Sequence, residues 1–225
     1  MCGRFNLTDS PAVHALLDDL SIDLGELPER YNIAPTEQVL TLRSIDGDYD
    51  ASMMRWWLVP CWSGGPSSRY AMFNARAETL ESSRAYRKPF QTQRAIVPVS
   101  SFIEWQRKDG EKVPYQISHR AEEPLLFAAL WDVWQGETHP LYSCSIITTQ
   151  ASDSFAGIHH RQPVMFSLDE ARQWMAPQLL ASDGKALLRQ STSPPLVACE
   201  IDRSVNHAAN KEKTYVANSQ AIHLA

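Results

Sequence analysis

Cys2 has the most distinctive chemistry in the chain, because it directly follows Met1. Removal of Met1 would leave an α-amine and a thiol on one residue. Such an aminothiol can form a Schiff base with an aldehyde through nitrogen and then close a thiazolidine ring through sulfur. An α-amine with a pKa of roughly 7.7 to 8 is partly unprotonated near neutral pH, and a thiol near about 8.5 is the more nucleophilic partner. The start of the sequence therefore predicts capture of an aldehyde, on the condition that Met1 is lost.

Two other interpretations of Cys2 stay open from its position alone. Chain ends are usually poorly ordered, so a cysteine at position 2 can be incidental. An N-terminal-nucleophile peptidase or amidase is the other alternative, because glutamine amidotransferases also begin Met-Cys-Gly and attack an amide with the cysteine. Arg4 argues against the amidase, since a cation beside the nucleophile suits a phosphate better than neutral glutamine.

Seven short motifs, taken in order, resemble those of the SOS-response-associated peptidase (SRAP) family. Each string alone is weak, but their combination over most of the chain is highly specific. The motifs are MCGRF at residues 1–5, RYNIAP at 30–35, RWWLVPCW at 55–62, NARAET at 74–79, FIEW at 102–105, ITT at 147–149 and IHHRQPV at 158–164.

The resemblance implies an α+β domain whose Cys2 forms a thiazolidine crosslink with the ring-opened sugar of an abasic site in single-stranded DNA. Asn74 would hydrogen-bond the opened sugar, since an amide can both donate and accept. Glu104 would be the proton shuttle, with a pKa raised by its apolar neighbours on a strand. His159 would protonate or orient the sugar oxygen and assist reversal of the link, while His160 is expected to point elsewhere. The resemblance implies no metal and no cofactor.

A path for single-stranded DNA over the protein surface is also implied. Arginines would bind the phosphates that flank the lesion, and two apolar side chains would pack against neighbouring bases. The phosphate ligands would be Arg4, Arg76, Arg84 and Arg161, and the base contacts would come from Trp62 and Pro35.

Three places depart from the family pattern. Trp57 stands where the family commonly has glycine, and the stretch from Ser63 to Tyr70 is longer or more polar than expected. Asp202 replaces the usual serine of a motif near the C-terminus. These changes leave the proposed catalytic positions intact and bear on the contacts along the DNA path.

Three functional hypotheses follow. The first is an abasic-site processor that crosslinks to DNA through Cys2, with release or strand cleavage by β-elimination from the Schiff base; autoprocessing of Met1 would explain the peptidase label. The second is a peptidase or amidase that uses Cys2, with Glu104 and His159 as base and acid. The third is a non-catalytic module that binds single-stranded DNA.

Composition limits how the protein could contact DNA, whether it could hold a metal and where in the cell it would act. The formal net charge of −5 argues against a protein that coats nucleic acid by bulk electrostatics, so contacts with DNA must be local. The four cysteines show no CxxC pair and no Cys/His spacing typical of a metal site. No apolar run approaches the roughly 20 residues of a membrane helix, and the N-terminus lacks a secretion signal. We therefore expect a cytoplasmic protein that joins the nucleoid when it binds DNA.

The elements that must position these residues are mainly short strands. Segments rich in β-branched and aromatic residues are not followed regularly by helices, which predicts an α+β fold. The resemblance adds a barrel-like core of mostly antiparallel strands flanked by helices, in one domain over residues 1–225. The segment around residues 134–140 is a weak candidate for a domain boundary and is interpreted as a hairpin loop. The predicted strands cover residues 38–44, 52–60, 94–100, 102–108, 113–119, 125–134, 141–149 and 195–201.

Helices and turns have sharper local signals. Asp9 or Ser10 caps a helix that Pro11 opens, because proline suits the first helical position. Gly110 supplies the positive φ of a hairpin turn, which places Glu104 on a strand of that hairpin. The segment 30–37 reads as a turn. The first helix should bury Val13, Leu16, Leu17 and Leu20, and further helical stretches are predicted at 77–87, 151–157, 167–175 and 180–190.

Overall fold

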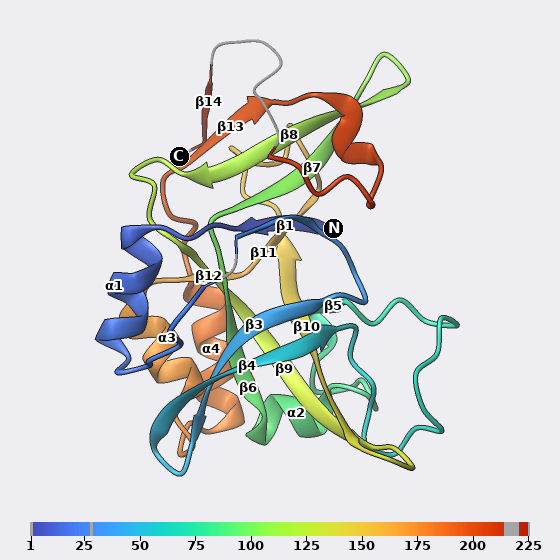
Figure 1. The fold of residues 1–225 in the computed structure, drawn as a ribbon, viewed down its shortest axis with the longest axis vertical. Coiled ribbons are helices and arrows are strands. Elements are labelled where there is room, and N and C mark those ends of the chain that lie inside the picture. The colour runs from blue at the N-terminus through green and yellow to red at the C-terminus, as the bar shows by residue number, and fades with distance from the viewer. Residues whose placement is uncertain (1, 28, 214–220, 225) are drawn as a thin grey trace.

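A closed barrel of five strands forms the centre of the protein (Figure 1). The computed structural model describes residues 2–27, 29–213 and 221–224. The barrel strands are β3 (Gln38–Ile45), β4 (Asp48–Trp56), β6 (Arg94–Val99), β9 (Leu125–Gln135) and β10 (Pro140–Gln150). Neighbouring strands pair antiparallel except β4 and β10, which run parallel, and β10 closes the ring by pairing with β9. Every residue of β6 is buried, as expected for a strand covered on both faces.

A second, antiparallel sheet lies at the top of Figure 1 and contains the N-terminal strand. In spatial order its strands are β14 (Ile222–Leu224), β13 (Leu196–Glu200), β8 (Glu111–His119), β7 (Ser101–Lys108), β1 (Arg4–Leu7) and β2 (Arg30–Ile33). Arg4 of β1 lies opposite Ile103 of β7, which brings the start of the chain beside the strand that carries Glu104.

Three short strands complete the barrel and carry motifs from the sequence. They are β5 (Asn74–Arg76), β11 (Arg161–Pro163) and β12 (Met165–Phe166). β5 runs parallel to β10, β11 runs antiparallel to β10, and β12 pairs with β9. The C-terminal end of β10 therefore pairs both with the strand that begins with Asn74 and with the strand that follows the two histidines.

Four helices flank the barrel in the described part of the chain: α1 (Pro11–Asp19), α2 (Arg87–Thr92), α3 (Leu168–Met175) and α4 (Ala181–Gln190). The first helix begins as predicted, because the Ser10 side chain accepts a hydrogen bond from the Val13 amide and Pro11 occupies the first turn. Its predicted apolar stripe is buried. Ser167 and Glu170 form a capping box that fixes the start of α3. These features confirm the α+β class with a mostly antiparallel, barrel-like core.

Two predicted helices were wrong. Residues 77–87 contain only the 3₁₀ helix Ala77–Thr79 before α2 begins at Arg87, and residues 151–157 form turns. Neither segment has an apolar stripe long enough to hold a helix against the barrel. The predicted turn at 30–37 is also corrected, because Arg30–Ile33 pairs with β1 as a strand.

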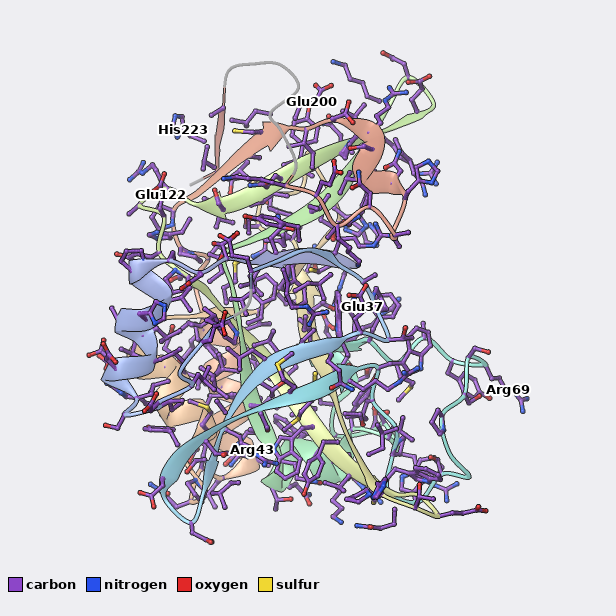
Figure 2. All side chains as sticks on the ribbon, in the orientation of Figure 1. Glu37, Arg43, Arg69, Glu122, Glu200 and His223 are labelled. Atoms are coloured by element: carbon purple, nitrogen blue, oxygen red, sulfur yellow. The ribbon has the colours of Figure 1, made fainter. Side chains whose placement is uncertain are left out.

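The predicted hairpins were confirmed, whereas the strand predicted at 52–60 ends at Trp56. Asp109 and Gly110 have φ values of 51° and 83°, and Lys108 pairs with Glu111 across the predicted hairpin turn. The loop around residues 134–140 joins the hairpin of β9 and β10, where Gln135 lies opposite Pro140. Side chains fill the space between the ribbons, while charged groups such as Arg69 project at the edge of the molecule (Figure 2).

Candidate active site

Cys2 is completely buried, in contrast to the frayed end that its position allowed. The side chain of Asn74 donates a hydrogen bond of 2.7 Å from Nδ2 to the carbonyl oxygen of Cys2. The thiol lies 3.8 Å from the carbonyl oxygen of Arg4. Burial, and then the charge of Glu104, raise the pKa of the Cys2 thiol well above its usual range, so the sulfur is protonated at neutral pH.

Glu104 lies on β7 within electrostatic range of Cys2, and it is only 2% exposed. The residue sits opposite Tyr115 in the β7–β8 hairpin that the sequence predicted. Burial raises the pKa of Glu104, which is the direction expected when a carboxylate loses contact with water. Burial therefore favours the protonated form of this carboxyl group, which can pass its proton to a reacting atom.

Asn74, the first residue of β5, is positioned by the pairing of β5 with β10, where it lies opposite Ile146. Its backbone carbonyl accepts a hydrogen bond of 3.3 Å from the Tyr86 hydroxyl. Its Oδ1 atom is buried and has no hydrogen-bond partner among the described residues. A buried acceptor without a partner is costly, so this atom is suited to a hydroxyl donor on a ligand.

His159 is held by the backbone of the residue two positions later. Its Nδ1 atom lies 3.0 Å from both the amide nitrogen and the carbonyl oxygen of Arg161. The amide can donate to the neutral ring and the carbonyl can accept from the cationic ring, so both protonation states have a partner. Burial, together with the charge of Arg161, lowers the pKa of His159 below its usual value.

His160 does not point elsewhere, and that expectation was wrong. The rings of His159 and His160 stack with their centroids 4.3 Å apart and an interplanar angle of 30°. The charge of His159 lowers the pKa of His160, and the charge of Glu104 acts in the opposite direction. The His160 imidazole therefore belongs to the electrostatic surroundings of the Glu104 carboxyl group, and His159 stacks against it.

Two contacts hold the loop that precedes His159 (residues 151–158) against strand β7. Gln106 donates a hydrogen bond of 2.8 Å from Nε2 to the carbonyl oxygen of Gly157. The rings of Phe102 and Phe155 stack with centroids 5.9 Å apart. Because Phe102 and Gln106 flank Glu104 along the strand, the loop before His159 is held against the strand that carries the carboxyl group.

Of the predicted phosphate ligands, Arg4 is tied into the protein. Its Nη1 atom donates to Asn32 Oδ1 at 3.1 Å and to the carbonyl oxygen of Val205 at 2.9 Å. Its guanidinium carbon lies 5.8 Å from the ring centroid of Trp105. Burial lowers the pKa of Arg4. Its binding to phosphate stays a prediction.

Arg84 and Trp62 meet beside a cavity of about 630 Å³. The guanidinium carbon lies 4.0 Å from the indole centroid, and Trp62 is 50% exposed. A cation over an exposed aromatic face suits a DNA backbone and base together. Pro35 is half-buried and Arg76 is exposed. Their assignment to DNA also remains a prediction.

The departures at Trp57 and at residues 63–70 turn out to be one feature. Trp57 donates from Nε1 to the carbonyl oxygen of Ser67 at 3.1 Å, and Trp134 donates from Nε1 to that of Ser63 at 2.9 Å. Gly65 has a φ of +125°, and a Cβ atom there would lie 3.3 Å from Cζ2 of Trp134. Two indoles thus anchor the loop that borders the cavity beside Trp62.

Asp202 has a structural role at its unusual position. Its side chain accepts a hydrogen bond of 2.7 Å from the Ser204 amide and so caps the 3₁₀ helix Arg203–Asn206. The Asp202 side chain is exposed, and its hydrogen bonds with Ser204 lower its pKa. The substitution keeps the local turn without reaching the site around Cys2.

Asn32 is a site-supporting residue that the sequence did not single out. It is fully buried with a φ of 49°, in the left-handed region that asparagine tolerates better than most residues. Its Nδ2 atom lies 3.2, 3.0 and 2.9 Å from the carbonyl oxygens of Val205, His207 and Asn210. Its neighbours, one aromatic and one β-branched, are typical of a buried strand and could have drawn attention to it. No local feature of the sequence, however, indicates a partner more than 170 residues away.

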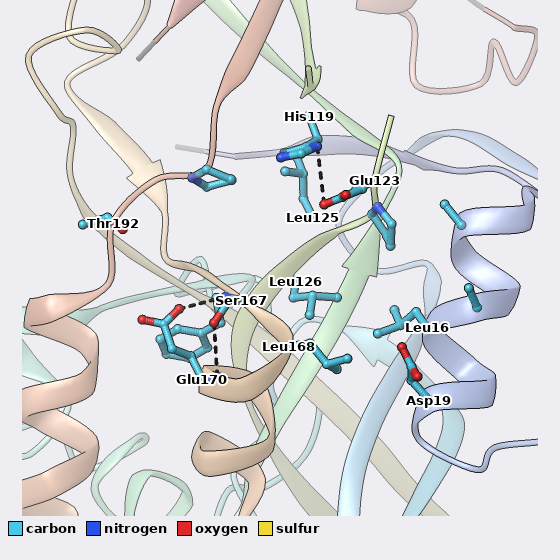
Figure 3. A pocket seen from close by; sticks show the side chains of 15 residues that line it. Leu16, Asp19, His119, Glu123, Leu125, Leu126, Ser167, Leu168, Glu170 and Thr192 are labelled. Atoms are coloured by element: carbon cyan, nitrogen blue, oxygen red, sulfur yellow. Dashed lines mark hydrogen bonds and ion pairs between the residues drawn. The ribbon is translucent and has the colours of Figure 1, made fainter. Parts of the chain in front are cut away.

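A second cavity, of about 580 Å³, lies between α1 and α3, away from Cys2 (Figure 3). Its floor is apolar, and His119 and Glu123 face each other across its rim at 3.8 Å. None of the predicted catalytic residues lines it. Among the described residues, no cluster of His, Cys, Asp or Glu could hold a metal ion. No helix in this part of the chain has the length and apolar character that a membrane crossing requires.

Known proteins share this fold and sequence pattern. The chain is 33% identical to the abasic site processing protein YoaM of Bacillus subtilis, over 93% of this chain and 95% of that one. It is 28% identical to YedK of Escherichia coli, another abasic site processing protein, over 86% and 88%. A solved structure from Bacteroides thetaiotaomicron matches with a TM-score of 0.75 and 22% identity, over 94% and 100%. The profile described as SOS response associated peptidase (SRAP) matches residues 1–208, and the chain belongs to this family.

Proposed function

We propose that this protein processes abasic sites in single-stranded DNA, and that Cys2 forms a covalent link to the damaged sugar after Met1 has been removed. The names of relatives such as YoaM and YedK support the substrate. One observation carries the proposal: Cys2 is buried, hydrogen-bonded by the half-buried side chain of Asn74 and placed in the field of a buried carboxyl group. A frayed chain end would have none of these features.

The proposed reaction consists of two additions to one carbon, the loss of water and proton transfers, with no redox step. A ring-opened abasic sugar presents an aldehyde, and the Cys2 amine adds to its carbon to form a carbinolamine. Glu104, whose raised pKa favours the protonated form, protonates the departing hydroxyl group, and loss of water leaves an iminium ion. The Cys2 sulfur then bonds to the iminium carbon while its proton passes to the Glu104 carboxylate. The product is a thiazolidine, Glu104 is protonated again, and no oxidant or reductant is used.

In this scheme Asn74 and His159 interact with the sugar. The unpartnered Oδ1 atom of Asn74 accepts a hydrogen bond from a sugar hydroxyl, while its Nδ2 atom keeps Cys2 in place. When the sugar opens, His159 takes the proton of the anomeric hydroxyl and donates a proton to the ring oxygen, and on reversal the two transfers run backwards. Its lowered pKa favours the neutral ring, which can also act as the base for reversal.

The buried thiol disfavours the peptidase or amidase alternative. A cysteine hydrolase attacks with a thiolate, so such enzymes lower the pKa of the nucleophile. Here burial and Glu104 both raise the pKa of Cys2. In the proposed reaction the sulfur attacks an iminium carbon, a stronger electrophile than an amide, and Glu104 removes the proton during attack.

Incubation with a single-stranded oligonucleotide that contains one abasic site tests the proposal. We expect an adduct that survives denaturing electrophoresis and has the mass of protein without Met1 plus DNA less one water. Cys2→Ser keeps the amine, so it should yield only an imine that borohydride can trap. An oligonucleotide with a tetrahydrofuran analogue, which lacks the aldehyde, is the matched control.

Two outcomes would contradict the proposal. Reversible binding without an adduct, by protein that has lost Met1, would favour a non-catalytic single-strand-binding module. Cleavage of peptides in the absence of DNA, lost in Cys2→Ala, would favour the peptidase. Mass analysis of the N-terminus must accompany every assay, because retained Met1 blocks the amine.

A further inference from the structure

The cavity between α1 and α3 takes no part in the proposed reaction (Figure 3). Its volume of about 580 Å³ falls within the range of about 300–1,000 Å³ that is typical of ligand pockets. Four almost fully buried side chains line its apolar floor: Leu16 from α1, Leu125 and Leu126 from β9, and Phe166 from β12. An apolar hollow of this size is suited to receive side chains from another molecule.

Small side chains on α1 keep the cavity open. Ala12 and Ala15 both line it, and Asp19 follows on the same side of the helix, because residues three or four positions apart share a helix face. Ala15 is exposed and Ala12 is half-buried. Larger apolar residues at these two positions would extend into the hollow and fill it, as side chains fill most of a protein interior.

The wall of the cavity is already formed in the free protein. Pro124 directly precedes β9 and Pro194 precedes β13, and the ring of proline fixes the φ angle of both residues. The two loops are joined, because the Arg120 amide donates a hydrogen bond of 2.9 Å to the carbonyl oxygen of Pro195. A site that is formed in advance loses little conformational freedom when a ligand binds.

The rim of the cavity is acidic. Asp19, Glu123 and Glu170 line it, and no lysine or arginine does so in the part of the chain that the structure describes. The three carboxylates stand on separate sides of the apolar side chains of Leu126 and Leu168 (Figure 3). The Glu123 side chain is 68% exposed, so its charge can reach a bound partner.

Neighbouring cations do not cancel this negative charge. His119 lies 3.8 Å from Glu123 and is charged only when it is protonated. Arg172 on α3 lies 3.4 Å from the carboxylate of Asp169 and donates to the backbone carbonyl oxygen of Asp19 at 2.9 Å. The three carboxylates therefore leave the rim net negative even when His119 is protonated.

We propose that this cavity docks a segment of a partner protein that presents large apolar side chains flanked by lysines or arginines. The apolar floor receives the apolar side chains, and the cations meet the carboxylates of the rim. The same carboxylates disfavour DNA phosphates and anionic lipid headgroups, which carry the same sign of charge. Docking here leaves the surroundings of Cys2 free and does not depend on the proposed crosslinking reaction.

Peptide selection on the full-length protein tests the proposal. The probe is a phage-displayed library of short random peptides, panned in the presence of excess DNA that carries the tetrahydrofuran analogue, so that the DNA-binding surface is occupied. We expect the enriched peptides to combine large apolar residues with flanking lysine or arginine. The Kd of each selected peptide is then measured by fluorescence anisotropy with wild-type protein and with variants.

Ala15→Trp is the decisive variant, because an indole at this position extends into the cavity from the exposed side of α1. We expect it to raise the Kd of the selected peptides by at least about tenfold. His14→Trp is the matched control, since it adds the same side chain at the preceding helix position, outside the cavity. It should keep the wild-type Kd. Thermal unfolding checks that both variants fold.

The charges of the rim are tested separately. Asp19→Asn combined with Glu123→Gln keeps the size of both side chains and removes two charges. The Kd should rise by about threefold to tenfold at low salt, and the difference should shrink at high salt, where exposed charges are screened. An unchanged Kd at low salt would contradict the assigned partner chemistry.

Other outcomes would also overturn the inference. The cavity is no docking site for such a segment if no enriched peptide loses affinity in Ala15→Trp, or if the sensitive peptides are acidic. A dimer of the wild-type protein in sedimentation velocity, abolished by Ala15→Trp, would assign the cavity to a second copy of this chain instead.

Discussion

The Asn74 side chain binds the backbone of Cys2 through Nδ2 at 2.7 Å and keeps its Oδ1 atom buried without a partner in the described structure. One amide group thus holds Cys2 and leaves an acceptor atom, which the proposed reaction assigns to the substrate. The two halves of the amide can be tested separately, because aspartate keeps the acceptor and loses the donor.

Asn74→Ala and Asn74→Asp should both slow adduct formation. A lost hydrogen bond to a reacting or positioning group costs about 1–3 kcal/mol, which corresponds to roughly 5- to 150-fold in rate. Single-turnover assays at saturating abasic DNA measure the effect, and thermal unfolding checks that both variants fold. Wild-type rates in both variants would remove Asn74 from the site.

Glu104 should make the stability of the protein depend on pH. Its pKa is raised in the folded state, so its protonated form is favoured there, and its contribution is lost as pH rises through that folded pKa. Glu104→Gln cannot ionise. The unfolding temperature of this variant, relative to wild type, should therefore increase from about pH 4 to about pH 8. A constant difference over that range would mean that Glu104 ionises as freely in the fold as in the unfolded chain.

Thiol reactivity should separate the four cysteines into two pairs. Cys2 and Cys144 are buried, with raised pKa values that reach about 12 for Cys144, whereas Cys61 and Cys199 are partly exposed. Timed alkylation of the folded protein near neutral pH, read by peptide mass analysis, should label Cys61 and Cys199 first, by at least about tenfold. Early labelling of Cys2 would indicate an accessible thiolate and revive the peptidase alternative.

Trp57→Gly would restore the residue common in the family and should loosen the loop at residues 63–70. The change removes the hydrogen bond to Ser67 and the ring contact with Phe73, whose centroids lie 5.5 Å apart. Hydrogen exchange in the loop should speed up, with a stability loss of about 1–3 kcal/mol. The rate of adduct formation at saturating DNA should stay near wild type. Unchanged exchange would show that Trp134 alone secures the loop.

Asn32→Asp should weaken the attachment of the C-terminal segment. A carboxylate cannot donate to the carbonyl oxygens of Val205, His207 and Asn210, and it would bury a charge beside them. We expect a loss of about 2–4 kcal/mol in urea unfolding. Asn206→Asp removes only the amide donor of a more exposed side chain and is the control. Equal stability of Asn32→Asp and wild type would contradict the role assigned to Asn32.

Local signals in the sequence were enough for some elements. Ser10 and Pro11 define the start of α1, and Gly110 defines the hairpin that places Glu104 on a strand. These features depend on neighbours within a few residues. The short strands that present Asn74 and Arg161 depend instead on pairing with β10, which lies far along the chain. A span of three residues carries too little periodicity to be recognised alone.

The contacts within the site were beyond local inference for the same reason. The sequence placed the two histidines side by side but could not give the stacking of His160 on His159. It indicated Arg161 as a phosphate ligand and could not give its ion pair with Glu78, because the two residues are 83 positions apart. The DNA contacts of the arginines and of Trp62 and Pro35 stay predictions that binding assays must decide.

The contacts of Arg4 and Asn32 with the C-terminal segment also impose an order of events on a newly made chain. Arg4 and Val205 are 201 residues apart, a distance that takes on the order of 10–40 s to synthesise at roughly 5–20 residues per second. Until then the strand that begins at Arg4 lacks this support, and the start of the chain is open to processing. The proposed removal of Met1 would take place either during that interval or later, at the completed site around Cys2.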